Sequence, residues 1–245
     1  MIKILAYSAA RSDTDRFYPF LNSLKKQDNV NLSVVASYIH YIEKFGDTIQ
    51  HLSKNFKVEK RRFSKNSLKD SPSQLGKNLA KEVFYLSNLF NKKKPDILIL
   101  MGDRYEILAP ATAAVPFNIP IVHFYGGAVT IGAVDELVRH GVTKMSHLHL
   151  TAHDKYSSRL VKMGEEKWRV KTVGIPEISN LRIQKNMRFE NLKKKTFLDL
   201  RLKTLLVTLH PTTLNFDNIG TEVDSLLNAL KKTKFQIVFT YPNSD

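Results

Sequence analysis

The sequence predicts an α/β fold built on a doubly wound parallel sheet. Two short apolar runs, Asp96–Met101 and Ile119–Phe124, flank an alanine-rich apolar segment over Ile107–Val115. Short buried strands joined by a helix form right-handed βαβ units with parallel strands. The residues before this unit repeat the alternation of apolar strand and helical pattern, which is typical of a doubly wound sheet.

The N-terminal elements follow from apolar spacing and from helix start signals. We expect strands over Ile2–Ser8, Asn31–Ser37 and Phe56–Phe63, the last amphipathic and therefore near an edge. We expect helices over Phe17–Leu24, with Ser12-Asp13-Thr14 as N-caps, over 38–53 with Gly46 interrupting, and from Ser71 to about Asn91. Pro72 suits the first position of that last helix because its missing N–H needs no partner there.

The C-terminal part divides into three segments. Strands are expected over Leu148–Ala152 and Trp168–Val173, and helices over His153–Met163, with Gly164 as breaker, and Pro176–Leu181. We expect residues 1–183 to form one Rossmann-like domain and 184–203, rich in Lys, Arg and Asn, to form a linker or a connecting helix. A new unit follows over 204–245, with strands Thr204–Leu209 and Phe235–Thr240 around a helix, Glu222–Leu230.

This last unit has only about 42 residues. A lone βαβ unit cannot bury both faces of its strands, and stable domains usually need more chain. We therefore expect 204–245 to begin an incomplete second domain, or to dock on the first domain or on a partner.

Composition restricts the class of protein. The 245 residues include no cysteine, which excludes disulfides and thiolate metal sites and is compatible with the cytoplasm, where we expect the protein. No apolar run approaches the roughly 20 residues that span a bilayer, so we expect no membrane segment. Residues 1–10 are expected to be a strand, not a signal peptide, because Arg11 and Asp13 follow at once.

The net charge of +15 leaves more than one interpretation open. The lysines are scattered along the chain, and no basic block is interleaved with stacking aromatic residues. We therefore expect no nucleic-acid partner. A solvated basic surface and an anionic small substrate, such as a nucleotide, both fit the charge.

Polar residues gather where the predicted strands end, and ligands of such sheets bind beyond the carboxyl ends of the strands. One predicted strand is followed by Asp103, Arg104 and Glu106. The next strand is followed by Asp135, Glu136, Arg139 and His140, and the strand of the 204–245 unit is followed by His210. Carboxylates and imidazoles in one cleft suit proton abstraction and donation. An alternative is that Asp103 caps a helix and that Asp135 and Glu136 only favour a helix dipole.

Two further loops at this edge suit a phosphate group. Arg11 follows the first strand, where it would hold a phosphate bidentately or form a surface salt bridge. Gly126-Gly127 lets the backbone approach a ligand, and helix N-termini nearby can hold phosphate oxygens. A lone histidine such as His40 is more often structural than functional.

Four histidines, His140, His147, His149 and His153, suggest a metal site at first sight. Their spacing does not place three ligands on one rigid face, and strand alternation separates them. We therefore expect no metal.

These motifs resemble the hydrolysing UDP-N-acetylglucosamine 2-epimerases that feed sialic- and legionaminic-acid synthesis. The central match comprises Gly102-Asp103-Arg104 with Glu106, His123 with Gly126-Gly127, Asp135 with Arg139-His140, and Thr143-Lys144-Met145-Ser146-His147. The likeness extends to Met163-Gly164-Glu165, Val173-Gly174, His210-Pro211, Arg11, His40, Gly46 and Thr48. It spans nearly the whole chain.

The resemblance implies a GT-B architecture, with two Rossmann-like domains around a cleft, and no metal or other cofactor. It implies conversion of UDP-N-acetylglucosamine, or a bacillosamine-type relative, and water into UDP and the C2-inverted sugar, by elimination of UDP and hydration of the glycal. Asp103, Asp135 and His210 match catalytic positions of the family. Substrate binding or site support is implied for Arg11, His40, Arg104, Gly126, Gly127, Arg139, His140 and Gly174.

Some features depart from the family pattern. Ala128 occupies a position where members commonly carry Glu, and Tyr125 occupies one where some members carry an acidic residue. The first loop has Ala9-Ala10, where the family usually has Gly. The chain is also shorter than family members, and the glycine/serine-rich loop that grips UDP is missing. An inactive remnant that binds a partner or a nucleotide-sugar is therefore the alternative, and a homodimer or a missing C-terminal half would complete the cleft. A GT-B glycosyltransferase is disfavoured by the Asp103, Asp135 and His210 set.

Overall fold

The computed structural model describes residues 1–42, 48–59, 71–178, 201–209 and 219–240, with isolated positions between 191 and 199. The chain divides into two compact units, Met1–Val129 with Asp135–Arg182, and Thr130–Val134 with Ile183–Asp245. The finer division at 183 and 203 stays a prediction. Within the described ranges, no helix is long and apolar enough to cross a membrane.

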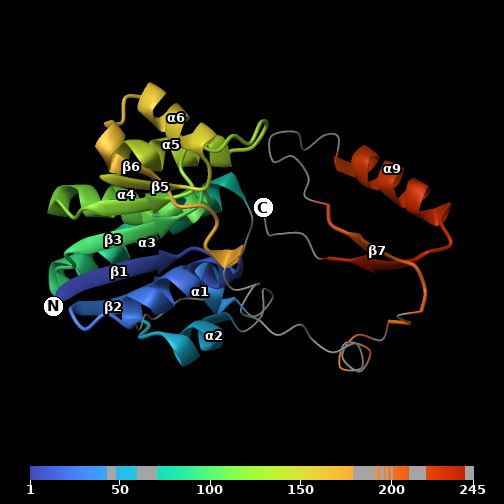
Figure 1. The fold of residues 1–245 in the computed structure, drawn as a ribbon, viewed down its shortest axis with the longest axis horizontal. Coiled ribbons are helices and arrows are strands. Elements are labelled where there is room, and N and C mark those ends of the chain that lie inside the picture. Colours follow the sequence, from blue (N-terminus) through green and yellow to red (C-terminus); the bar gives the residue numbers. More distant parts are fainter. Residues whose placement is uncertain are drawn as a thin grey trace. The chain divides into compact units, whose positions relative to one another are not determined.

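The first unit is built on a six-stranded parallel sheet of order β2-β1-β3-β4-β5-β6 (Figure 1). The strands are β1 (Ile2–Ser8), β2 (Val30–Ala36), β3 (Ile97–Met101), β4 (Ile121–Phe124), β5 (Leu148–Thr151) and β6 (Val170–Thr172). From β1 the chain first builds outward to β2 and then crosses to β3 on the other side. Parallel sheets bind ligands at the carboxyl edge near such a reversal.

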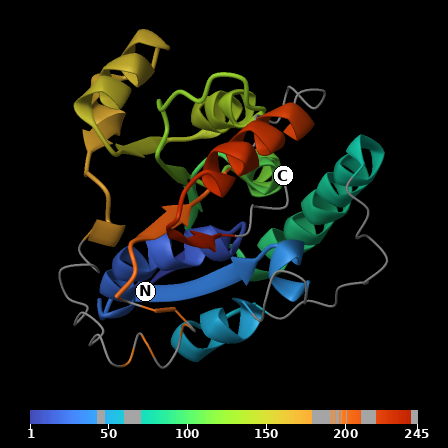
Figure 2. The ribbon, with the colours of Figure 1, turned by 90° about the vertical axis from the view of Figure 1, so that its right-hand side faces the viewer.

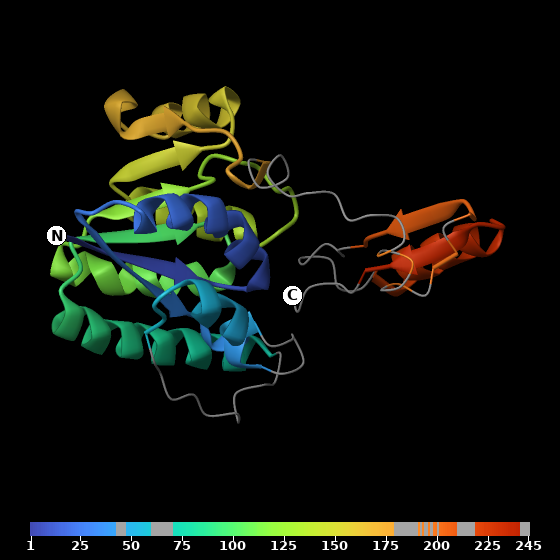
Figure 3. The same ribbon diagram turned by 60° about the horizontal axis from the view of Figure 1, so that its bottom comes forward.

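Helices cover both faces of this sheet, as Figure 3 shows for α1 above and α3 below the strands. The helices are α1 (Arg11–Lys25), α2 (Thr48–Asn55), α3 (Pro72–Lys93), α4 (Leu108–Ala114), α5 (Asp135–Met145) and α6 (Asp154–Lys162). Short 3-10 turns are η1 (Tyr38–Tyr41), η4 (Tyr105–Ile107), η5 (Val115–Phe117) and η6 (Lys167–Arg169). The doubly wound α/β prediction is confirmed.

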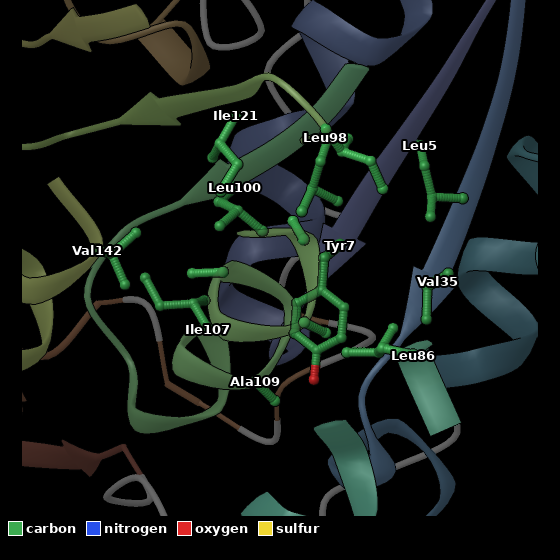
Figure 4. Close-up of a cluster of buried hydrophobic side chains, with 14 of the residues drawn as sticks. Leu5, Tyr7, Val35, Leu86, Leu98, Leu100, Ile107, Ala109, Ile121 and Val142 are labelled. Atoms are coloured by element: carbon green, nitrogen blue, oxygen red, sulfur yellow. The ribbon is translucent and has the colours of Figure 1, made fainter. Parts of the chain in front are cut away.

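Alternation along β1 divides the core into two layers. Leu5 and Tyr7 point to the side of α3, α4 and α5, where they join Leu86 (Figure 4). Ile4 and Ala6 point to the side of α1 and α2. Both faces of the strand are buried, which explains why it reads as a continuous apolar run.

The second unit contains β7 (Thr204–Val207), α9 (Ile219–Lys231) and β8 (Gln236–Phe239), drawn in orange to red in Figure 2. The two strands pair in parallel, so the predicted βαβ unit is confirmed. No residue of α9 is buried, and alternate strand residues such as Leu206, Ile237 and Phe239 are exposed.

Helix α1 starts earlier than the pattern predicts. Its N-cap is Ala10, so Arg11 is the first helical residue, not part of a loop. Asp13 caps the helix from inside, because its Oδ2 accepts hydrogen bonds from the amides of Ala9 (3.2 Å) and Ala10 (3.3 Å). The prediction of Ser12-Asp13-Thr14 as N-caps is therefore wrong in position.

The single helix expected over 38–53 is also wrong. The turn η1 ends at Tyr41, Ile42 has an extended backbone, and α2 begins at Thr48. The ring of His40 turns inward and contacts Ser8 Oγ and Thr48 Oγ1, each at 3.0 Å. Gly46 lies outside the described residues.

Two predicted strands are shorter than expected. Of Phe56–Phe63, only Val58 pairs, in a single parallel bridge with Val34, and 60–63 lie outside the described residues. Trp168 belongs to the 3-10 turn η6, so β6 begins at Val170. Of the helix expected over Pro176–Leu181, Glu177 and Ile178 are helical, and 179–181 lie outside the described residues.

Candidate active site

An ion pair joins the loops after two neighbouring strands. Asp103 follows Gly102, which ends β3 with a left-handed φ of 79°. Arg139 on α5 donates to Asp103 Oδ2 from Nε at 2.9 Å and again from Nη2. The two residues, 36 positions apart, thus meet at the carboxyl edge of the sheet, as the sequence pattern predicts.

The guanidinium of Arg139 is shared among several acceptors. Its Nη1 donates to Glu136 Oε2 at 2.8 Å and to the carbonyl of Ala128 at 2.9 Å. The other Glu136 oxygen lies 3.1 Å from His140 Nε2. Arg139 is only 1% exposed, so it links the glycine loop, α5 and Asp103 into one rigid support. Asp135, at the start of α5, is positioned by the same helix.

The glycine loop is shaped by close packing on α6. A Cβ at Gly127, whose φ is 79°, would lie 2.5 Å from the carbonyl oxygen of Tyr156, so no larger residue fits. Arg159 Nη1 donates to the Gly127 carbonyl at 2.7 Å. At Gly126 a Cβ would crowd Thr143 Oγ1 at 3.1 Å. The requirement for glycine here is therefore internal to the fold.

His123, in β4, supports the loop that carries Asp103. The ring is fully buried, and its Nε2 lies 2.8 Å from the carbonyl of Gly102. Because a carbonyl only accepts, Nε2 carries the proton, and Nδ1 accepts from Thr143 Oγ1 at 3.4 Å. Burial lowers the pKa of His123 to about 4, which keeps the ring neutral. The family resemblance included this residue, but residue types alone gave it no role.

Asp13 is a buried carboxyl group at the same edge, in the first turn of α1. Burial raises its pKa to about 6, although the nearby charge of Arg104 and the amide of Ala10 oppose this shift. The sequence indicated only a helix cap at this position. A buried carboxyl group with a raised pKa at this edge is a candidate functional residue.

The remaining predicted residues of this edge differ in accessibility. Arg11 is exposed at the start of α1. Arg104 is paired through Nε with buried Glu106 at 3.3 Å. His40 is 1% exposed and enclosed by Ser8 and Thr48, and burial lowers its pKa to about 4. Its contacts are those of a residue that supports the first loop.

A second polar cluster, which the sequence did not reveal, lies on the α1 side of the edge. Tyr125, with a φ of 67°, directs its hydroxyl to Glu177 Oε2. Arg16 Nε lies 3.5 Å from Glu177 Oε1. Burial raises the pKa of Tyr125, and the charge of Glu177 raises it further. Gly174, which lies shortly before Glu177 in the sequence, has a left-handed φ of 78° and open space around it.

His210 lies outside the described residues, so its predicted role stays a prediction. The four histidines considered as metal ligands each have another contact. His140 contacts Glu136 and His149 contacts Glu165. His147 accepts from the amide of Ile121, and His153 accepts from the amide of Lys155. In the part of the chain that the structure describes, no three His, Cys, Asp or Glu side chains gather around one point.

Two of the family-like motifs meet at a structural ion cluster. Glu165 contacts Lys144 Nζ at 2.6 Å and His149 Nε2 at 3.0 Å. Burial lowers the pKa of His149. These contacts tie α5 and β5 to the turn after α6 and give Lys144 and Glu165 a structural role.

Comparison with known proteins gives a consistent result. The profile of the UDP-N-acetylglucosamine 2-epimerase family matches residues 22–245. The chain is 34% identical to a GDP/UDP-N,N'-diacetylbacillosamine 2-epimerase (hydrolyzing) of Campylobacter jejuni, over 99% of this chain and 63% of that protein. It is 29% identical to a UDP-N,N'-diacetylbacillosamine 2-epimerase (hydrolyzing) of Legionella pneumophila, over 99% of this chain and 64% of that protein. The chain thus spans under two thirds of the length of these relatives.

Solved structures show the same fold. The UDP-GlcNAc 2-epimerase of Neisseria meningitidis bound to UDP-GlcNAc aligns with a TM-score of 0.78 at 20% identity, over 100% of this chain and 67% of that chain. The UDP-GlcNAc 2-epimerase of Methanocaldococcus jannaschii in complex with UDP-GlcNAc and UDP aligns with a TM-score of 0.79 at 18% identity, over 99% and 66%. The expected GT-B-like fold is confirmed.

Proposed function

Because the chain belongs to the UDP-N-acetylglucosamine 2-epimerase family, we propose that it converts a UDP-sugar and water into UDP and a free sugar inverted at C2. The substrate is UDP-N-acetylglucosamine or a UDP-diacetamido sugar. The names of the Campylobacter and Legionella relatives support the second. The product would feed nonulosonic-acid synthesis in the cytoplasm.

The proposed chemistry has two balanced steps. A carboxylate takes the proton from C2, the C2–H electron pair forms the C1=C2 double bond, and the C1–O bond breaks with its electrons going to the β-phosphate oxygen of UDP. Water then adds across the glycal, its oxygen bonding to C1 while a proton returns to C2 on the opposite face. Inversion requires two acid–base groups, and we assign these to Asp103 and Asp135.

The observation that carries this proposal is the ion pair between Asp103 and Arg139. The pair keeps a partly exposed carboxylate fixed at the edge where ligands of parallel sheets bind. A general base must be held in a defined position to take a proton from a weakly acidic carbon. We assign the binding of the leaving pyrophosphate to Arg11 and the helix N-termini of this edge. His210 is assigned to the cleft by resemblance alone.

A second candidate function is binding of a nucleotide-sugar without turnover. Ala128 favours it, because a general acid or base contributes roughly 10²–10⁴-fold in rate and the usual carboxylate of that position is absent.

Chromatographic measurement of UDP release tests the proposal. The purified chain is incubated with UDP-N-acetylglucosamine and, separately, with a UDP-diacetamido sugar, and Asp103→Asn serves as the site control. We expect release above the uncatalysed rate that Asp103→Asn abolishes. A folded chain that releases no UDP from either sugar contradicts the proposal. In that case, release regained by Ala128→Glu would identify the missing carboxylate as the cause.

A further inference from the structure

The Tyr125–Glu177–Arg16 cluster brings together residues from three separate segments, each of which follows a strand of the sheet. Arg16 lies on α1 after β1, Tyr125 directly follows β4, and Glu177 follows β6. Glu177 accepts from the Tyr125 hydroxyl through Oε2 and faces the Arg16 guanidinium at 3.5 Å through Oε1. The cluster therefore fixes one carboxylate at the edge where the family-like site lies.

The backbone of Tyr125 supports a role beyond packing. Its φ of 67° lies in the left-handed region, which is unfavourable for a non-glycine residue. Its amide is held by the carbonyl of Leu150 at 2.9 Å, and its ring packs on Phe124. The strained backbone aims the hydroxyl across the edge to Glu177. Retained strain of this kind concentrates at functional sites.

Asp103 and Glu177 are tied to different layers of the core. Asp103 is bound by α5, which packs on the layer of Leu86 and Val138. Tyr125 belongs to the other layer, with α1 and α2. A sugar placed over the strand ends would have acidic groups on both sides, which the two-step chemistry needs because water must also lose a proton.

From this geometry, and resting on the proposed function, we propose that Glu177 is the general base that activates water in the hydration step, in place of the carboxylate missing at Ala128. A carboxylate oxygen within reach of a water molecule can act as a general base toward it. With 28% of its side chain exposed, Glu177 is reachable by water yet held by two partners. As the water oxygen bonds to C1, Glu177 takes the proton that water loses, and an aspartic acid protonates C2.

The test separates UDP release from sugar formation. The full chain and Glu177→Gln are given the UDP-sugar, and UDP, free sugar and glycal are measured together by NMR. We expect Glu177→Gln to release UDP while the sugar accumulates as the glycal, with hydration slowed roughly 10²-fold or more. Glycal and UDP supplied directly should be hydrated by the unmodified chain and not by this variant.

Two further variants control for loss of folding. Glu166→Gln removes an exposed carboxylate paired with Arg169 and should leave all products unchanged. Tyr125→Phe keeps the ring but removes the hydroxyl, and should slow hydration less than Glu177→Gln does because the charge remains.

The outcomes that overturn the inference are distinct. Free sugar formed by Glu177→Gln at the rate of the unmodified chain removes Glu177 from the reaction. Loss of UDP release in that variant contradicts a role confined to hydration. If the unmodified chain releases no UDP at all, the proposed function fails, and the assignment of Glu177 falls with it.

Discussion

Arg139 holds Oδ2 of Asp103 with two of its nitrogens while being itself almost inaccessible to solvent. It also pairs with Glu136. Removing one partner of a buried ion pair costs about 3–5 kcal/mol, because the remaining charge is left uncompensated. The pair therefore stabilises the fold and also holds the proposed catalytic carboxylate in position.

We expect Arg139→Met to lower the free energy of unfolding by about 3 kcal/mol, since two carboxylates lose their cation. Urea denaturation measures this change. Arg169→Met is the matched control, because Arg169 also pairs with a glutamate three residues away but on the surface, where such pairs contribute about 0–1 kcal/mol. Equal losses in the two variants would contradict a central role for Arg139.

Gly127→Ala should destabilise the chain far more than Gly174→Ala. Both glycines have left-handed φ values, so both variants carry a backbone cost of about 1–2 kcal/mol. Only at Gly127 would the new methyl lie 2.5 Å from a backbone oxygen, which adds about 1–3 kcal/mol of overpacking. Thermal unfolding of the two variants in parallel gives the comparison, and similar values would show that the packing on α6 is not as close as described.

Stability should fall as the pH drops below about 6.5. The folded pKa values of His40 and His123 are about 4, below the value of 6.5 in an unfolded chain. Between these values the unfolded chain binds more protons than the folded chain, so lowering the pH favours unfolding. At pH 5 each histidine lowers the free energy of unfolding by about 2 kcal/mol relative to neutral pH. Urea midpoints from pH 7.5 to 5 measure the loss. His123→Asn, which can still donate to Gly102, should show a smaller pH dependence.

Asp13 should act in the opposite direction. Its folded pKa of about 6 lies above the ordinary 3.8, so the folded chain binds more protons within that interval and stability falls as the pH rises through it. At pH 7 the buried charge is a cost. We therefore expect Asp13→Asn to raise the free energy of unfolding by about 1–3 kcal/mol at pH 7 and to gain much less at pH 4. A loss of stability at pH 7 would show that the amide contacts outweigh the burial of the charge.

The sequence predicted those parts of the candidate site that lie at strand ends and helix starts. Asp103, Asp135 and Arg139 follow strand ends or begin a helix, and parallel strands bring such positions together without further information. The strands and most helices were predictable for the same reason, because apolar periodicity records burial.

Other parts depend on partners distant in the sequence. Tyr125 and Glu177 are 52 residues apart, and nothing local to either residue indicates their contact. His40 is enclosed by Ser8 and Thr48, and its neighbours in the sequence do not indicate these contacts. Asp13 resembles an ordinary helix cap in the sequence, and its pKa is raised because neighbouring elements bury it. Tertiary contacts override local preference at each of these positions.

The configuration and isotope content of the product at C2 test the central claim most directly. The chain is incubated with a UDP-sugar in D2O, and the released sugar is observed by proton NMR. Elimination followed by hydration predicts a C2-inverted sugar that carries deuterium at C2, formed together with UDP and lost in Asp103→Asn. A sugar that keeps its original configuration and its C2 proton would mean simple hydrolysis at C1 and would contradict the account.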